Sequence, residues 1–119
     1  MTVPTSEKTL VWKRAVRTAD VPAESGGSVL IDDRQFAVFH FRNPDAWYAC
    51  QNQCPHKGDM VIGRGLIGDD KGEPKVACPQ HKKTFSLVSG KNLGGEAYCL
   101  DTYPVKIEDG YVFIGIASA

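Results

Sequence analysis

Cys54-Pro55-His56 and Cys78-Pro79-Gln80-His81 each place a thiol and an imidazole close together in the chain. The 119 residues include four cysteines and three histidines, and these two segments hold two of each. The proline after each cysteine fixes one backbone dihedral and stiffens the segment. Two thiolates and two imidazoles are a full ligand set for a metal centre. The sequence therefore predicts a metal site formed by two loops.

The division of the ligands between the loops indicates which metal centre is favoured. Zinc sites with two cysteines and two histidines usually take like ligands from one segment. Here each loop is mixed, which suits two metal ions bound side by side. In a Rieske [2Fe-2S] centre, two cysteines bind one iron and two histidines bind the other. We therefore expect one [2Fe-2S] cluster per chain, with Cys54 and Cys78 on the inner iron and His56 and His81 on the outer iron.

Two other interpretations of these residues stay open. Zinc could occupy the same four side chains, because its ligand preference overlaps that of iron. Alternatively, the cysteines could be small buried apolar residues and the histidines ordinary surface groups, with no metal bound. The third histidine, His40, lies among phenylalanines, and we expect it to be hydrogen-bonded or exposed and not a ligand.

The rest of the chain predicts an all-β domain. Apolar or alternating segments bounded by turn residues are typical of short strands. Asp32-Asp33 and Asp109-Gly110 are expected to be hairpin turns, and twelve glycines and seven prolines fit a fold with many turns. The expected strands are residues 10–16, 29–31, 36–41, 47–50, 75–77, 84–88, 103–107 and 111–116.

Each metal loop follows a predicted strand, 47–50 before Cys54 and 75–77 before Cys78. Ligands at strand ends are held rigidly, which suits electron transfer because little reorganisation is needed. Between the loops, residues 57–77 are rich in glycine and charge. A small domain rarely carries a loop of that length without order. We therefore expect this segment to be ordered and to pack near the cluster.

Length and charge limit the other possibilities. The chain is expected to be one domain, 9–117, with the metal loops within 52–96 and a polar tail at 1–8. Fourteen basic and fourteen acidic residues leave no net charge, so the composition does not suggest nucleic acid or an anionic membrane as a partner. Neither a membrane span nor a secretion signal is visible. Thiols in that context predict a cytoplasmic, metal-binding protein.

Further residues extend the pattern beyond the four ligands. They are Cys54 to Gly58, Gly63 to Asp69, and Cys78 to Lys83 followed by Phe85, Leu87 and Gly90. In its two loops the chain resembles the Rieske ferredoxins. In the segment between the loops it resembles, more specifically, the small subunit of the cytoplasmic NAD(P)H-dependent assimilatory nitrite reductase. The resemblance extends over about residues 10–116.

The resemblance implies a Rieske-type fold of stacked antiparallel sheets with a cluster-binding subdomain. It also implies a partner, a large subunit that carries FAD, siroheme and a [4Fe-4S] cluster. That complex reduces nitrite to ammonium in nitrate assimilation, with electrons from a nicotinamide. The chain itself has no glycine-rich dinucleotide fingerprint. We therefore expect an oxidoreductase subunit that transfers electrons and is not catalytic alone.

Four positions depart from the high-potential Rieske proteins of respiration. Those proteins have a disulfide between the loops and two hydroxyl groups that donate hydrogen bonds to sulfur. The corresponding residues here are Asp59 and Gln80 for the disulfide and Lys83 and Phe85 for the hydroxyls. Fewer hydrogen bonds to sulfur favour the oxidised state, which predicts a midpoint near the low end of the Rieske range, about −150 mV.

The remaining polar and thiol residues have simpler interpretations. Lys57, Arg64, Lys82 and Lys83 surround the ligands in sequence. They could be a solvated rim, or a docking rim for an acidic patch on the large subunit, where charges steer association. Cys50 and Cys99 are expected to be structural thiols, and a disulfide between them is the less favoured alternative.

Two alternative functions stay open on the sequence alone. The first is a stand-alone Rieske ferredoxin that serves a ring-hydroxylating dioxygenase. The segment Gly63 to Asp69 argues against it. The second is a non-redox interaction module whose site holds zinc or no metal. Metal analysis with a visible spectrum separates this module from a redox protein, because a Rieske site holds an iron–sulfur cluster.

Overall fold

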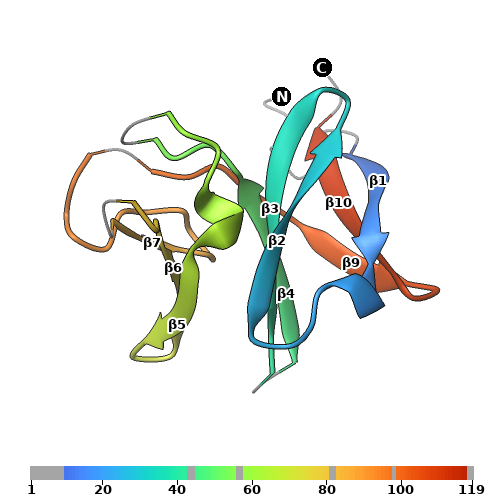
Figure 1. Ribbon diagram of the computed structural model, residues 1–119, viewed down its shortest axis with the longest axis horizontal. Helices are drawn as coiled ribbons and strands as arrows, with labels where there is room; N and C mark the ends of the chain where they lie inside the picture. Colours follow the sequence, from blue (N-terminus) through green and yellow to red (C-terminus); the bar gives the residue numbers. More distant parts are fainter. Residues whose placement is uncertain (1–9, 43–44, 56–57, 81–82, 98, 118–119) are drawn as a thin grey trace, which may run out of the picture.

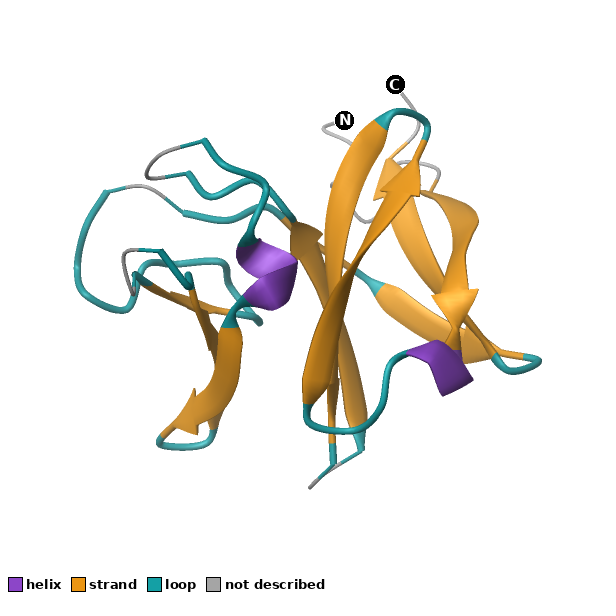
Figure 2. Ribbon diagram, viewed as in Figure 1, coloured by secondary structure: helices purple, strands orange, loops and turns teal. Residues whose placement is uncertain are grey.

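The structure is a computed structural model that describes residues 10–42, 45–55, 58–80, 83–97 and 99–117. The described chain forms three antiparallel sheets (Figures 1 and 2). Two of these sheets lie together, and the third forms a smaller unit beside them (Figure 1). The all-β prediction is confirmed. No helix in the described ranges is long and apolar enough to cross a membrane.

The strands of each sheet come from distant parts of the chain. The first sheet has the order β1 (Leu10–Arg17), β10 (Tyr111–Ala117), β9 (Val105–Glu108). The second has the order β2 (Ser25–Ile31), β3 (Arg34–Phe41), β4 (Ala46–Gln51), β8 (Thr102–Tyr103). The third has the order β5 (Leu66–Asp70), β6 (Glu73–Ala77), β7 (Thr84–Ser86). Two 3₁₀ helices, η2 (Thr18–Asp20) and η3 (Ile62–Arg64), connect strands.

The two predicted hairpin turns are present. Asp32 and Asp33 join β2 to β3 with φ of 50° and 65°. Asp109 and Gly110 join β9 to β10 with φ of 52° and 79°. Positive φ at both central residues is the backbone of a type I′ turn, which Asp and Gly adopt more readily than most residues. These turns fix the register of both hairpins.

Several predicted strand boundaries were wrong, and β2 for example begins at Ser25 and not at residue 29. The strand predicted over 103–107 is divided at Pro104, so that β8 pairs with β4 and β9 pairs with β10. Proline has no N–H for a ladder, and the Pro104 carbonyl instead accepts a hydrogen bond from Gly115 N–H at 2.9 Å. The strand predicted over 84–88 ends at Ser86, where a turn begins.

The two faces of β3 contribute to two separate apolar cores. Phe36 and Val38 pack with residues of β10, Val112 and Ile114 among them. Ala37, one position along the strand, packs in a second core that includes both loop cysteines, Cys54 and Cys78. Alternation along a strand directs neighbouring side chains to opposite faces. The central sheet therefore joins the first sheet on one face to the smaller unit on the other.

Glycines allow the smaller unit to approach the central sheet closely. A Cβ on Gly63, in η3, would lie 2.9 Å from the Gly27 carbonyl oxygen of β2. A Cβ on Gly26 would lie 2.5 Å from the ring of Phe39. No side chain fits at either position without displacing its neighbours. This close approach explains the glycine at position 26, in a part of β2 that the sequence alone did not predict as strand.

Candidate metal centre

The two loop cysteines lie in one buried apolar cluster. Cys78 follows β6 directly, and Cys54 follows β4 after a short bend. Both side chains have 0% exposure. The same cluster contains Cys50, Ile62, Val76, Phe85 and Leu87. The structure therefore brings together two thiols that are 24 positions apart in the sequence and excludes water from both.

The two loops have the same backbone construction. Cys54 N–H donates to the Asp59 carbonyl oxygen at 2.7 Å, and Cys78 N–H donates to the Lys83 carbonyl oxygen at 2.8 Å. Each bond joins a cysteine to the fifth residue after it and encloses the following proline. In the first loop, Gly58 N–H also donates to the Cys54 carbonyl oxygen at 2.7 Å, with Gly58 at φ +84°. These bonds hold both cysteine backbones in closed, stiff loops.

The predicted histidine ligands lie outside the described residues. His56 and His81 belong to the enclosed parts of the two loops by sequence, as do Lys57 and Lys82 of the proposed rim. The structure therefore describes the two cysteine ligands and the backbone closure of both loops. The assignment of the two imidazoles stays a prediction from the motif.

The segment between the loops packs in the apolar cluster that contains Cys54 and Cys78, and its order was expected from its length. Ile62 of η3 and Val76 of β6 are fully buried beside the loop cysteines. A Cβ on Gly65 would lie 2.4 Å from the Ala77 carbonyl oxygen, so β5 leaves η3 in close contact with β6. The described part of residues 57–77 therefore supports the second loop, in which Cys78 directly follows β6.

Asn52 is a structural residue of the site that the sequence did not reveal. Its side chain is 2% exposed. Its Oδ1 accepts a hydrogen bond from Gly63 N–H at 2.7 Å, and its Nδ2 donates to Gln35 Oε1 at 2.9 Å. The amide thereby connects β3, the first loop and η3, two residues before Cys54. Because a polar residue next to a loop is usually exposed, no local pattern could have identified it.

Three of the positions that differ from the respiratory Rieske proteins are Phe85, Asp59 and Gln80, which have neither a hydroxyl nor a thiol group. Phe85 is fully buried in the cluster that contains Cys54 and Cys78. Its ring supplies no hydroxyl group there. Asp59 takes part in the first loop through its backbone carbonyl oxygen, and Gln80 is exposed.

The structure separates the two remaining cysteines. Cys50 and Cys99 are not joined in a disulfide, so that alternative was wrong. Cys50 is fully buried, as expected, and burial raises the pKa of its thiol to about 12. Cys99 was expected to be structural, but it is exposed. Its position beside buried Leu100 made the sequence look apolar there, although only Leu100 enters the core.

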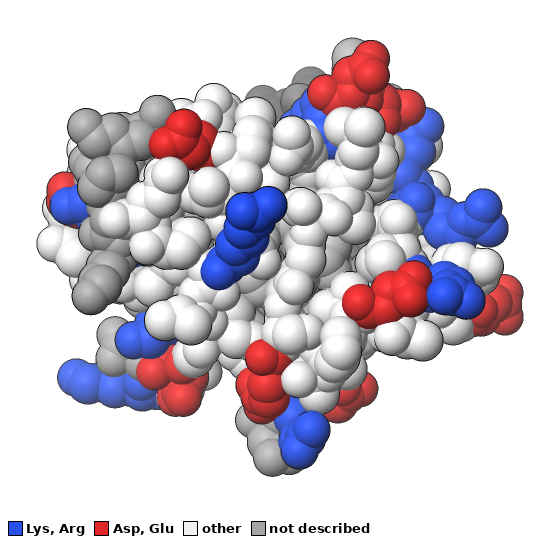
Figure 3. All heavy atoms as spheres, in the orientation of Figure 1, with Lys and Arg blue, Asp and Glu red and all other residues white. Residues whose placement is uncertain are grey.

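The described basic residues near the loops do not form a uniform charged rim. Lys83 Nζ lies 3.0 Å from the carboxylate of Glu96, so its charge already has a partner. Arg64 is exposed at the end of η3. On the face shown in Figure 3, most charged side chains lie toward the edges, and one basic side chain lies across the otherwise uncharged middle of the face.

His40 has hydrogen-bond partners on both ring nitrogens. Nδ1 lies 3.1 Å from the Val21 carbonyl oxygen, and Nε2 lies 2.6 Å from Asp45 Oδ1. The ring stacks on Trp47 at 4.0 Å. This agrees with the interpretation of His40 as a bonded histidine.

The described residues fit a [2Fe-2S] cluster on its cysteine side. A pair of buried thiols in apolar surroundings, each on a loop closed by backbone hydrogen bonds, is a rigid site for soft metal ions. The buried Cys54 and Cys78 satisfy that requirement.

Comparison with known proteins agrees with this site. The family model of the Rieske-like [2Fe-2S] domain matches residues 11–115. The chain belongs to the Rieske-like [2Fe-2S] family. Members of this family are iron–sulfur proteins, so the cofactor is a Rieske-type [2Fe-2S] cluster and the chemistry is electron transfer.

Three similar proteins place the chain within this family. It is 33% identical to the nitrite reductase (NADH) small subunit of Escherichia coli K12, and the match covers 85% of this chain and 94% of that protein. The structure of the E. coli protein NirD superposes with a TM-score of 0.81 at 31% identity, covering 92% of this chain and all of the other. A ferredoxin subunit of the 3-phenylpropionate/cinnamic acid dioxygenase of Shigella flexneri is 35% identical, covering 88% and 93%.

A longer relative contains a domain of the same kind. The nitrite reductase [NAD(P)H] of Emericella nidulans is 39% identical over 98 residues, and the chain spans 9% of its length. The Rieske-type domain therefore occurs both as a separate small chain and as part of a longer protein.

Proposed function

We propose that this chain is the Rieske electron-transfer subunit of an NAD(P)H-dependent nitrite reductase. The single observation that carries the proposal is the pair of equivalently closed loops, which hold Cys54 and Cys78 together in a dry core. The nearly full-length relationship to nitrite reductase small subunits supports the choice of reaction. Reduction of nitrite to ammonium would take place on the partner and not on this chain.

We assign the ligands as Cys54 and Cys78 on the inner iron and His56 and His81 on the outer iron. The cluster supplies one-electron transfer when it is bound. The chain's own residues position the thiolates, exclude water from them and limit their movement between redox states. Imidazoles in place of two thiolates lower the negative charge of the site and raise its potential above that of a four-cysteine cluster.

The partner in this proposal is a large subunit with FAD, siroheme and a [4Fe-4S] cluster, and the complex is cytoplasmic. The names of the similar small subunits support a large-subunit partner. Cys50 and Cys99 are thiols outside any disulfide, and Cys99 is exposed, which supports a reducing compartment.

Substitution of the ligands tests the assignment. Cys54→Ser, His56→Ala, Cys78→Ser and His81→Ala should each abolish the visible absorption of the cluster, because each removes an iron ligand. Cys50→Ser is the matched control in the same buried cluster and should keep the absorption. The assignment fails if a ligand variant keeps a wild-type spectrum or if Cys50→Ser loses it.

Binding and reduction by the cognate large subunit test the reaction. When reduced nicotinamide is added to the complex of both chains, the cluster should become reduced, and the complex should then reduce nitrite. A cluster that stays oxidised in the complex would reject the electron-transfer role.

We further propose that Arg64, together with Lys57 and Lys82, forms a docking rim for an acidic patch on the large subunit. Rim charges act mainly on the rate of association. Arg64→Glu should therefore slow complex formation at low salt, and the difference from wild type should shrink as salt rises, because salt screens exposed charges. An association rate equal to that of the wild type at low salt would remove Arg64 from the rim.

A second candidate is a ferredoxin for a ring-hydroxylating dioxygenase. The 35% identity to the Shigella flexneri ferredoxin subunit favours it. The two candidates differ in the partner that is found. Copurification of the chain with a siroheme protein supports the first candidate. The second candidate is supported if the reduced chain transfers electrons to a dioxygenase faster than to the siroheme protein.

A further inference from the structure

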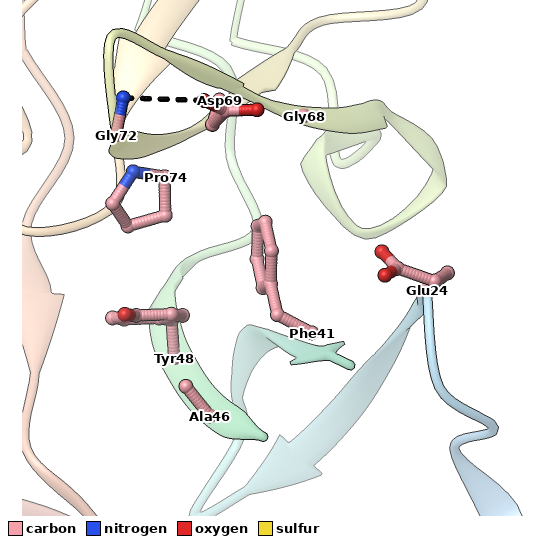
Figure 4. A pocket seen from close by; sticks show the side chains of 8 residues that line it. All are labelled: Glu24, Phe41, Ala46, Tyr48, Gly68, Asp69, Gly72 and Pro74. Atoms are coloured by element: carbon pink, nitrogen blue, oxygen red, sulfur yellow. Dashed lines mark hydrogen bonds between the residues drawn. The ribbon is translucent and has the colours of Figure 1, made fainter. Parts of the chain in front are cut away.

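A cleft of ≈ 320 Å³ lies between the central sheet and the tip of the β5–β6 hairpin (Figure 4). Phe41 is the last residue of β3, Tyr48 lies within β4, and Asp69 and Pro74 come from the hairpin. Cys78 follows the opposite end of β6, a five-residue strand about 17 Å long. The cleft is therefore separate from the metal loops.

The floor of the cleft is aromatic. Phe41 and Tyr48 are half-buried, and their rings meet edge to face with centroids 5.4 Å apart at 89°. Both rings lie at the cleft in Figure 4. Aromatic ring faces carry negative electrostatic potential and attract cations.

Two carboxylates stand on opposite walls of the cleft. Glu24, from the segment before β2, directs its carboxylate toward the cleft (Figure 4). Its backbone has φ of +64° and is held by a 2.7 Å hydrogen bond from Glu24 N–H to the His40 carbonyl oxygen. Its Oε1 also accepts a bond from Arg42 N–H at 3.3 Å. These two hydrogen bonds hold the Glu24 backbone at a positive φ and fix the position of its carboxylate.

Asp69 is fixed on the other wall by the hairpin turn. Its Oδ2 accepts a hydrogen bond from Gly72 N–H at 3.1 Å. Each carboxylate has one oxygen on a backbone amide, which leaves its other oxygen for a further donor. The described lining residues include no lysine or arginine. Two fixed anions above an aromatic floor form a site for a cation.

We propose that this cleft receives an arginine side chain of the partner large subunit, as a second contact away from the cluster. A guanidinium is flat, stacks on aromatic rings and donates to two carboxylates at once. The complementary charge and the exposed position of Glu24 and Asp69 suit a group presented by another protein. The inference rests on the proposed function for the identity of the partner.

The first test measures binding of the iron-loaded chain to the cognate large subunit. The double variant Glu24→Gln and Asp69→Asn should raise the Kd at least about tenfold, because it leaves the partner's buried cation without counter-charges. The matched control, Glu108→Gln and Asp109→Asn, removes the same charge at the β9–β10 turn and should leave the Kd within about twofold. Both variants should keep the wild-type visible spectrum. A Kd of the cleft variant within twofold of the wild type overturns the proposal.

The second test uses a small probe and does not need the large subunit. N-acetyl-arginine amide should shift the amide resonances of Gly68 and Gly72, and the uncharged N-acetyl-citrulline amide should not. The shifts should disappear in the cleft variant. If the wild-type chain does not bind the large subunit, the proposed function fails, and this probe still decides the chemistry of the cleft. Absence of any shift with the arginine probe overturns the cation site.

Discussion

At the scale of single residues, the cysteines show how position decides chemistry. Cys54 and Cys78 are buried at the starts of closed loops, where a metal ion can replace their protons. Cys50 is equally buried but continues a strand, and the raised pKa of its thiol keeps it protonated at neutral pH. Cys99 is exposed. Cysteine spacing identified the first pair, whereas the exposure of Cys99 depends on tertiary packing.

Thiol labelling at pH 8 tests this distinction. In the iron-loaded protein, Cys99 should react with a thiol reagent and Cys50 should not. With a pKa of about 12, only about one Cys50 thiol in ten thousand is ionised at that pH, and burial blocks access as well. Cys99→Ser should therefore abolish labelling of the native protein. Labelling that persists in Cys99→Ser and disappears in Cys50→Ser would contradict the burial of Cys50.

Phe85 is the residue that most directly links packing to redox potential. By the resemblance, it stands at the position of a hydroxyl donor of the high-potential proteins, and it packs in the apolar cluster that contains both loop cysteines. Phe85→Tyr should raise the midpoint potential by on the order of tens of mV, from an expected wild-type value of about −150 mV, because a hydrogen bond to sulfur stabilises the reduced cluster. A redox titration measures the change.

Phe36→Tyr is the control for that substitution. Phe36 is equally buried but belongs to the other core, on the opposite face of β3. It should leave the potential unchanged. Equal potentials for Phe85→Tyr and wild type, or a wild-type midpoint above about +100 mV, would contradict the explanation by missing donors.

At the scale of elements, local signals predicted the hairpins and long-range contacts set the rest. The Asp-Asp and Asp-Gly turns carry their own backbone preference, so the sequence was sufficient to predict them. The start of β2 was missed because its Gly26-Gly27 pair has low strand propensity. Gly26 is required because the ring of Phe39 and the Gly63 carbonyl oxygen of η3 lie where its Cβ would be, and both contacts join residues far apart in the chain. The division of β8 from β9 similarly depends on which sheet each segment joins.

Gly90 tests the packing of the chain behind the second loop. It has φ of +80°, and a Cβ there would lie 2.0 Å from the Leu100 carbonyl oxygen. Leu100 N–H also donates to the Gly90 carbonyl oxygen at 2.8 Å. Gly90→Ala should lower the free energy of unfolding by about 3 kcal/mol or more, because the segment must move. Denaturant unfolding measures the loss.

Gly95→Ala separates the steric effect from the backbone effect. Gly95 has φ of +86°, but a Cβ there meets nothing within 4 Å. Only the positive φ is unfavourable, so the expected loss is about 1 kcal/mol. Equal losses for the two variants would show that the contact with Leu100 is not important for stability.

At the scale of the whole molecule, the central sheet holds a structural core on one face and the metal loops on the other. The sequence predicted the metal site because its ligands occur in two compact motifs. It could not predict the cleft, since Glu24 and Asp69 come from separate units and neither lies in a recognisable pattern. The proposed complex would thus use two regions of the chain, the loops for electron transfer and the distal cleft for attachment.

We expect the two mixed loops to bind a [2Fe-2S] cluster. Iron, acid-labile sulfide and zinc should be measured on protein purified without air, together with its visible spectrum. We predict two irons and two sulfides per chain and a coloured protein. One zinc per chain in a colourless protein would contradict the claim.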